Sequence, residues 1–308
     1  FEGGMTGGDS IRIGSPSNIP IGNSPWSLSM WVQMNEYQDT TVAYGFLFDR
    51  GNSSLYPSGR RPDREMHRLS VGWQVPGYPP TDRDELWNCF WGVPYDYYTG
   101  VTIDLNTWYH ITNTYDGSTA RIYVNGIERW SRIIGPSLDI RSSDIWLGCG
   151  LGGSHATSCT IDEVAMFDRP LTPEEIRQQY ENGLDGLDYL TSKVVVDIKP
   201  GSNPNSINLK SKGMVPVAVL TTVDFDAGTV DESSVEFAGA SPQHWAMEDV
   251  DNDGDEDKVF HFKMQEMRDP DLGLDESSTE ATLSGVTYDG IPIEGTDTVN
   301  IVPKNKKK

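Results

Sequence analysis

The chain has 308 residues, of which 46 are acidic and 24 are basic, giving a net charge of −22 at pH 7. Such an acidic excess disfavours nucleic acid and anionic membranes as partners, because both would repel the protein. No uninterrupted apolar run reaches the length of about 18 residues that a membrane-spanning helix needs, so no membrane span is expected.

The opening of the chain predicts a location. The chain begins at Phe1, with neither an initiator methionine nor a charged-then-apolar signal segment. A processed protein that is secreted or displayed on the cell surface would begin in this way, and so would a trimmed fragment. We therefore expect an extracellular protein.

Basic residues divide the chain into two parts. Residues 1–190 contain no lysine, whereas every lysine lies beyond them. Tryptophan shows the opposite distribution, since Trp245 alone lies in the later part. Two domains, 1–190 and 191–308, are therefore predicted.

The first domain begins with strands. Residues 10–14 alternate in polarity, and so do residues 26–32, where Trp26, Leu28, Met30 and Val32 share one face. No helical period of useful length occurs before Pro173. The pattern favours a β-sandwich or barrel over an α/β fold.

Residues 49–100 are predicted to form a long, turn-rich insertion. Loops of this kind commonly carry function, and aromatic rings stack on the apolar faces of sugars. The alternative is that these rings pack the loop onto the sandwich. The candidate glycan contacts are Trp73, Tyr78, Trp87, Trp91, Tyr95 and Tyr97.

A hairpin and a helix follow. Asp116-Gly117 and Asn125-Gly126 are turn dipeptides, and the strand-like segment 118–124 lies between them. Thr172 is a suitable N-cap and Pro173 a suitable first helical residue, while Gly183 is predicted to end the helix in the left-handed conformation.

Cysteine positions indicate one candidate disulfide. Cys149 and Cys159 flank a glycine-rich segment between the strand-like runs 145–148 and 160–164. If those strands are neighbours, the two sulfurs can meet, and a bridge would stabilise the fold by roughly 2–3 kcal/mol. Two buried free thiols are the alternative, and Cys89 is expected to be buried.

Several of these segments together resemble a known family. Trp108-Tyr109-His110-Ile111, Tyr115-Asp116-Gly117, residues 121–126 and residues 160–183 stand in the order found in laminin G-like, concanavalin A-type jelly rolls. The resemblance covers roughly residues 1–190. It implies an all-β jelly-roll sandwich with one short helix, and a structural calcium ion held by Asp162 with backbone carbonyls from the start of the chain. A solvent-facing Asp162 is the alternative.

The second domain is also predicted to be built from strands. Strand-like runs occur at 193–198, 206–209, 215–220, 258–262, 281–283 and 299–302, and no helix is required. The sequences of these runs and their order resemble a β module of secreted bacterial and archaeal proteins. A smaller β-sandwich-like domain is therefore expected.

Residues 249–257, DVDNDGDED, predict a calcium loop in the second domain. Acids at alternate positions with glycine sixth resemble an EF-hand or dockerin loop, in which side chains one, three and five converge on one ion. The twelfth position is Phe260, so the usual bidentate glutamate is missing. The candidate Ca²⁺ ligands are Asp249, Asp251, Asp253, Asp255 and Asp257, and a solvated acidic turn is the alternative.

Function follows from these parts as an expectation. Glycosidases also use jelly rolls, but the Glu-x-Asp-x-x-Glu strand motif of such hydrolases does not occur. We expect a calcium-stabilised, non-catalytic, lectin-like binding or adhesion protein of the cell surface or extracellular matrix. The alternative is a structural subunit that assembles into a homo-oligomer or filament, its acidic body contacting the basic tail at 304–308. A polysaccharide-degrading enzyme is the third and weakest reading.

Overall fold

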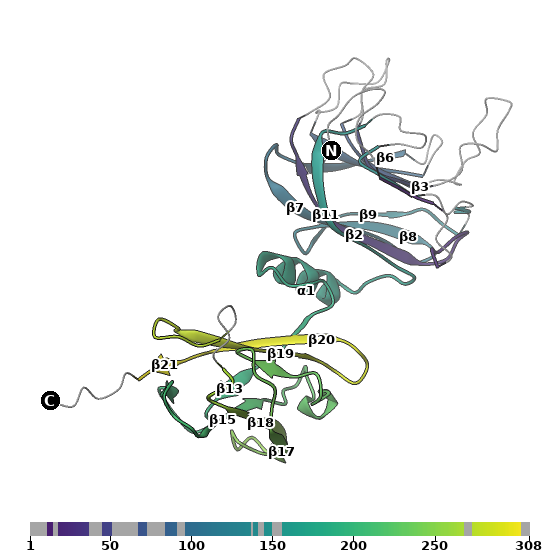
Figure 1. The fold of residues 1–308 in the computed structure, drawn as a ribbon. Coiled ribbons are helices and arrows are strands. Elements are labelled where there is room, and N and C mark those ends of the chain that lie inside the picture. Colours follow the sequence, from purple (N-terminus) through teal and green to yellow (C-terminus); the bar gives the residue numbers. More distant parts are fainter. Residues whose placement is uncertain are drawn as a thin grey trace. The chain divides into compact units, whose positions relative to one another are not determined.

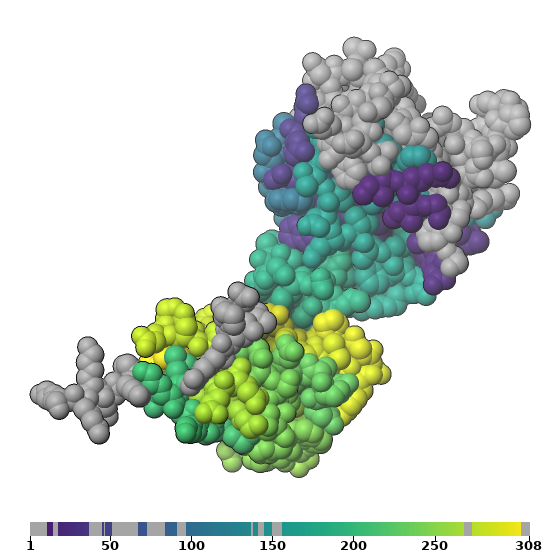
Figure 2. Space-filling model, in the orientation of Figure 1, coloured from purple at the N-terminus to yellow at the C-terminus, as the bar shows by residue number. Residues whose placement is uncertain are grey.

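The fold is known from a computed structural model, which describes residues 11–14, 18–36, 45–50, 67–72, 84–90, 96–136, 138–140, 145–149, 156–267 and 273–302. The chain divides into two compact units, Phe1–Tyr189 (unit 1) and Leu190–Lys308 (unit 2) (Figure 1). Purple to teal atoms belong to unit 1 and green to yellow atoms to unit 2 (Figure 2). No helix among the described residues is long and apolar enough to cross a membrane.

Within its described residues, unit 1 consists of two antiparallel sheets. One has six strands in the order β1-β10-β3-β4-β5-β6, and the other has five in the order β11-β2-β7-β8-β9. The strands are β1 (Ile11–Ile13), β2 (Trp26–Met34), β3 (Gly45–Arg50), β4 (His67–Val71), β5 (Glu85–Cys89), β6 (Asp96–Thr102), β7 (Trp108–Tyr115), β8 (Thr119–Val124), β9 (Ile127–Ile133), β10 (Ile145–Leu147) and β11 (Cys159–Phe167).

The core of unit 1 lies between the two sheets. Strand β2 directs Trp26, Leu28, Met30 and Val32 into it, as the alternation predicts. The six-stranded sheet contributes buried side chains from three of its strands, namely Phe48, Leu69 and Leu86. Burial of each such side chain stabilises the fold by about 1.5–3 kcal/mol. The predicted all-β sandwich is confirmed.

The prediction that residues 49–100 form a long, turn-rich insertion is wrong. Its described residues supply β4, β5 and β6, half of the six-stranded sheet. The segments between these strands are rich in Gly, Pro and Asp, and this turn-like composition hid the three strands in the sequence. The segment is therefore part of the sandwich frame.

The hairpin between β8 and β9 forms as predicted. Val124 pairs with Ile127, so the loop has two residues. Asn125 and Gly126 both have positive φ, at 52° and 77°. This is the backbone of the tight hairpin turn that suits the twist of the flanking strands.

Helix α1 (Pro173–Leu184) follows β11 and begins where predicted. Thr172 Oγ1 accepts a hydrogen bond from Glu175 N at 3.2 Å, and Glu175 Oε2 accepts one from Thr172 N at 2.8 Å, which together form a capping box. The helix lies against the outer face of the five-stranded sheet, where Ser29 Oγ donates to Gln179 Oε1 at 2.7 Å.

The predicted role of Gly183 is wrong. Gly183 lies inside the helix, and Gly186, with φ +73°, adopts the left-handed conformation beyond its end. A Cβ atom on residue 183 would lie 2.3 Å from Trp31 Nε1. The glycine is therefore explained by close contact with the indole rather than by the backbone angle.

Unit 2, over its described residues, pairs two four-stranded sheets, ordered β12-β20-β19-β16 and β13-β15-β18-β17, with a two-stranded sheet β14-β21. Its elements are β12 (Ser192–Lys193), β13 (Val196–Ile198), β14 (Ser206–Ile207), β15 (Met214–Val219), η1 (Ala227–Thr229), β16 (Glu236–Phe237), β17 (His244–Glu248), β18 (Asp257–Lys263), β19 (Glu280–Val286), β20 (Pro292–Thr298) and β21 (Asn300–Ile301). Unit 2 has its own core, in which the ring centres of Phe237 and Phe262, one from each four-stranded sheet, lie 5.3 Å apart.

Candidate functional site

The acidic loop connects β17 to β18 in unit 2. Ligand oxygens of Asp249, Asp251 and Asp257 all lie within 4.8 Å of one another. Gly254, the sixth residue, has φ +104°, a conformation open to glycine, and it lets the backbone turn back on itself. The structure thus brings together positions one, three and nine of the predicted loop.

The side chain of Asp257 holds the backbone of this loop in place. Its side chain is fully buried, with Oδ1 accepting from Thr221 N at 2.9 Å and Oδ2 from Val250 N at 3.0 Å. Asp249 and Asp251 remain exposed, and each accepts one backbone hydrogen bond, from Asn252 N at 2.8 Å and Asp253 N at 3.2 Å. The loop is therefore preformed, and the remaining lone pairs of its exposed carboxylates face the solvent.

Electrostatic repulsion within the loop is visible in two carboxyl groups. Desolvation and the nearby charges of Asp253, Asp257 and Asp249 raise the pKa of Asp251. Desolvation and the charges of its acidic neighbours, Asp253 first among them, also raise the pKa of Asp255. A bound cation would relieve this repulsion.

The donor set fits a hard divalent cation. All the converging groups are carboxylates, the oxygen ligands that Ca²⁺ prefers. Among the described residues, Asp255 Oδ1 is buried and has no hydrogen-bond partner, which leaves a further oxygen available beside the cluster. Asp253 Oδ1 instead accepts from Asp255 N at 3.1 Å. Asp249, Asp251 and Asp257 are therefore the ligands that the geometry supports best.

Asp162 lies in a different setting. Its side chain is exposed on β11, and Oδ1 accepts from the neighbouring Glu163 N at 2.9 Å. The carbonyls expected to share a calcium ion with it belong to the start of the chain, where residues 1–10 lie outside the described residues. Calcium at Asp162 stays a prediction.

Asp162 lines a cavity of about 550 Å³ in unit 1. The other lining residues include Trp31, Trp108, Glu163, Gly183 and Leu184. They come from β2, β7, β11 and the end of α1. The sequence does not reveal this site because its residues come from four elements, although Trp31, which follows Ser27 and Ser29 on the polar face of β2, is a usable signal.

Two of the predicted glycan-binding aromatics are described, and both pack against other side chains, Trp87 buried and Tyr97 partly buried. Trp87, on β5, is 2% exposed and its ring centre lies 3.5 Å from that of Tyr98. Tyr97, on β6, packs against the core and Trp130. The packing alternative therefore holds for these two, while Trp73, Tyr78, Trp91 and Tyr95 lie outside the described residues.

Cys149 and Cys159 are both buried thiols in the structure. Their strands are not sheet neighbours as supposed, because β10 and β11 belong to different sheets. Thr157 N nonetheless donates to Gly148 O at 2.8 Å, which brings the two segments together. The bridge stays a prediction, to be decided by mass spectrometry after alkylation in denaturant without reductant.

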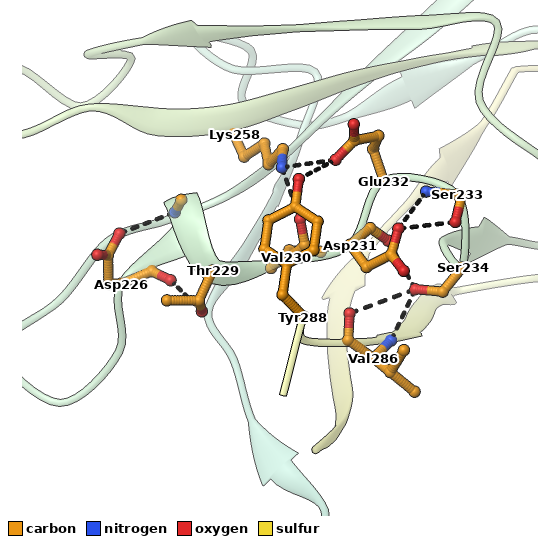
Figure 3. A network of polar contacts seen from close by, with 11 residues as sticks. Asp226, Thr229, Val230, Asp231, Glu232, Ser233, Ser234, Lys258, Val286 and Tyr288 are labelled. Carbon is orange, nitrogen blue, oxygen red and sulfur yellow. Dashed lines mark hydrogen bonds and ion pairs between the residues drawn. The ribbon is translucent and has the colours of Figure 1, made fainter. Parts of the chain in front are cut away.

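A second polar cluster in unit 2 surrounds a buried lysine (Figure 3). Lys258 is 2% exposed, and its Nζ donates to Val230 O at 2.6 Å and to Glu232 Oε2 at 3.1 Å. The Tyr288 hydroxyl donates to the same carboxylate oxygen, and Nζ lies 4.4 Å from the ring centre of Trp245. With its ammonium group enclosed in this way, Lys258 serves the structure of unit 2.

Known proteins place unit 1 in a family. A sequence model of the concanavalin A-like lectin/glucanases superfamily matches residues 5–177, more than half of the chain. No curated protein matches the chain.

Comparison with solved structures finds similarity at low identity. Domain 4 of AbnA, a GH43 extracellular arabinanase from Geobacillus stearothermophilus in complex with arabinotriose, is 21% identical with a TM-score of 0.37, covering 55% of this chain and 70% of that domain. The SAP-like pentraxin of Limulus polyphemus is 13% identical with a TM-score of 0.40, covering 56% and 75%. The Trypanosoma rangeli sialidase is 19% identical with a TM-score of 0.37, covering 52% of this chain and only 23% of the sialidase. On the strength of the sequence match, the chain belongs to the concanavalin A-like lectin/glucanases superfamily.

Proposed function

We propose that the chain is a secreted, non-catalytic carbohydrate-binding protein whose unit 2 is stabilised by Ca²⁺. The observation that carries the carbohydrate part is the superfamily match over residues 5–177, together with a sandwich of two sheets over the same residues. Because one fold hosts both binding proteins and enzymes, the ligand class has to be tested directly.

Calcium is proposed on the geometry of the acidic loop. Three carboxylates converge within 4.8 Å on a backbone held by the buried Asp257. This loop and its β frame resemble extracellular calcium modules, whose dissociation constants fall on the order of 0.1–1 mM. Such an affinity would suit an extracellular protein, in keeping with the proposed location at the cell surface or in the matrix.

The non-catalytic role is proposed from the sequence. A retaining or inverting glycosidase holds two carboxyl groups about 5–10 Å apart across the scissile bond. The short acidic strand motif that supplies such pairs in jelly-roll hydrolases does not occur in this chain.

An array of neutral, amino and acidic oligosaccharides, probed with the purified chain in about 2 mM Ca²⁺, tests the proposal. Binding to a defined set of glycans is expected, without release of reducing sugar from those glycans over hours. Reducing-sugar release would establish an enzyme, and a blank array would remove the carbohydrate function.

A further inference from the structure

The cavity beside Trp31 lies on the sheet face that points away from the sandwich core. Met30 and Val32 flank Trp31 on β2 and enter the core, so Trp31 points to the opposite face. Strand pairing sets Asp162, Trp31 and His110 side by side in one row across β11, β2 and β7. With a volume of about 550 Å³, the cavity falls in the range of roughly 300–1,000 Å³ of small-molecule sites.

A β-bulge brings two carboxylates to this cavity. Neighbouring residues of a regular strand point to opposite faces, yet Asp162 and Glu163 both line the cavity. The register of β11 against β2 shifts between Asp162 and Ala165, and Glu163 has φ 49°, unusual for a residue other than glycine. Bulges commonly redirect a side chain in this way next to a functional site.

Two of the polar groups at the cavity have no partner in the part of the chain that is described. Trp31 is 91% buried, at 9% exposure, and its indole N–H has no hydrogen-bond acceptor. Glu163 Oε2 is buried and has no donor. Buried polar groups are hydrogen-bonded in about nine cases of ten, so one unpaired donor and one unpaired acceptor at the same cavity indicate a ligand that offers both.

The wall behind Trp31 carries no charge. His110 is fully buried 5.4 Å from Trp31, and burial lowers its pKa to about 4, so the imidazole is neutral at pH 7. Tyr189 packs on His110 at 5.3 Å, and burial raises the pKa of its hydroxyl, as do the charges of Glu163 and Asp162. The charge that faces a ligand is therefore negative.

The negative charge selects among ligands. Asp162 and Glu163 are neighbouring carboxylates that both line the cavity, and no basic side chain is among the described residues that line it. An anionic ligand would add to the repulsion, whereas an amine would relieve it. A simple metal or organic cation would satisfy Glu163 but would leave the Trp31 N–H unpaired.

We propose that this cavity binds a neutral or amino sugar and disfavours uronic and sialic acids. Hydroxyl groups of the sugar donate to Glu163 and Asp162, a sugar oxygen accepts from Trp31 Nε1, and the C–H face of the ring stacks on Trp108, which is 39% exposed at the rim. This inference rests on the carbohydrate-binding function proposed above and gives that function a place and a ligand class.

Matched sugars and matched variants test the inference. The probes are methyl glycoside, amino sugar and uronic acid in both the gluco and galacto series, measured by saturation-transfer NMR titration of the intact chain. The variants are W108A and E163Q, and the control is W245A, which removes a tryptophan of similar exposure, 41%, from unit 2. Circular dichroism and thermal unfolding confirm that each variant is folded.

Wild type and W245A should bind the neutral and amino sugars and not the uronic acids. W108A should weaken binding about tenfold, and E163Q should weaken the amino sugars more than the neutral ones. Sugar binding that both pocket variants retain would overturn this site while leaving the carbohydrate function intact. A preference for uronic acids would overturn the ligand class, and a wild-type chain that binds none of the probes or the arrayed glycans would overturn both proposals.

Discussion

At the scale of single residues, Lys258 and Glu232 form an ion pair whose two partners differ in solvent access. The lysine is 2% exposed, whereas the glutamate is 32% exposed. Loss of the carboxylate would leave an ammonium group buried with Val230 O as its remaining hydrogen-bond acceptor. Loss of the ammonium would leave a carboxylate that water and Tyr288 can solvate.

This asymmetry predicts that E232A destabilises unit 2 more than K258M does. We expect E232A to lower the free energy of unfolding by about 1–3 kcal/mol, and K258M, which keeps the apolar stem, to change it by less than about 1 kcal/mol. Urea unfolding followed by the fluorescence of Trp245, with the other tryptophans replaced by phenylalanine, measures both. A larger loss in K258M would contradict the argument.

The same pair predicts an acid dependence. The hydrogen bond from Tyr288, aided by Lys258, lowers the pKa of Glu232 to about 2, below the value of about 4.3 expected in the unfolded chain. Stability from this group is thus present above about pH 4.3 and lost as the pH falls toward 2. The E232Q variant should lose less stability than wild type between about pH 5 and pH 2, measured by urea midpoints, and parallel curves would refute the assignment.

At the scale of elements, the start of helix α1 depends on one hydroxyl group. Removing the capping oxygen in T172A should lower the stability of unit 1 by about 1 kcal/mol, because Glu175 N would lose its acceptor. T172S retains the oxygen and should lose only a small part of that stability. Thermal unfolding of unit 1 compares them, and equal losses in the two variants would show that the methyl group, not the cap, matters.

Elements whose signals are local could be predicted from the sequence. The cap at Thr172, the Asn125-Gly126 turn and the alternation of β2 are set by a few neighbouring residues, and all three are confirmed. Strands β4 to β6 were missed because turn-like residues surround them. The role of Gly183 could not be predicted locally, because a glycine is needed there to leave room for Trp31, about 150 positions away in the chain.

The candidate sites divide in the same way. The acidic loop is continuous in sequence, so its ligands were predicted, although the burial of Asp257 and its two backbone donors depend on the fold. The cavity in unit 1 joins side chains from β2, β7, β11 and α1. Its second carboxylate, Glu163, faces the cavity because of a β-bulge, and no residue pattern in the sequence predicts that bulge.

At the scale of the whole molecule, two separate hydrophobic cores predict two unfolding transitions. One core is built from residues of unit 1 and the other from residues of unit 2, and the acidic loop belongs to unit 2 alone. Calcium bound at the acidic loop should therefore stabilise the transition of unit 2, whereas calcium bound at Asp162 would stabilise that of unit 1. With a dissociation constant on the order of 0.1–1 mM, about 10 mM Ca²⁺ would add roughly 1.5–3 kcal/mol, which differential scanning calorimetry detects as a rise of several degrees.

The variant D251N separates ion binding from repulsion. The pKa of Asp251 is raised, so its charge destabilises the metal-free fold at neutral pH, and this effect grows as the pH rises through that pKa. In chelator, D251N should therefore unfold at the same temperature as wild type or higher, while in calcium its gain should be much smaller. The control is E248Q, which removes one carboxylate just outside the converging group. It should keep the full calcium shift. A transition of unit 2 that calcium does not shift, or a shift that D251N leaves undiminished, would remove the acidic loop as a calcium site.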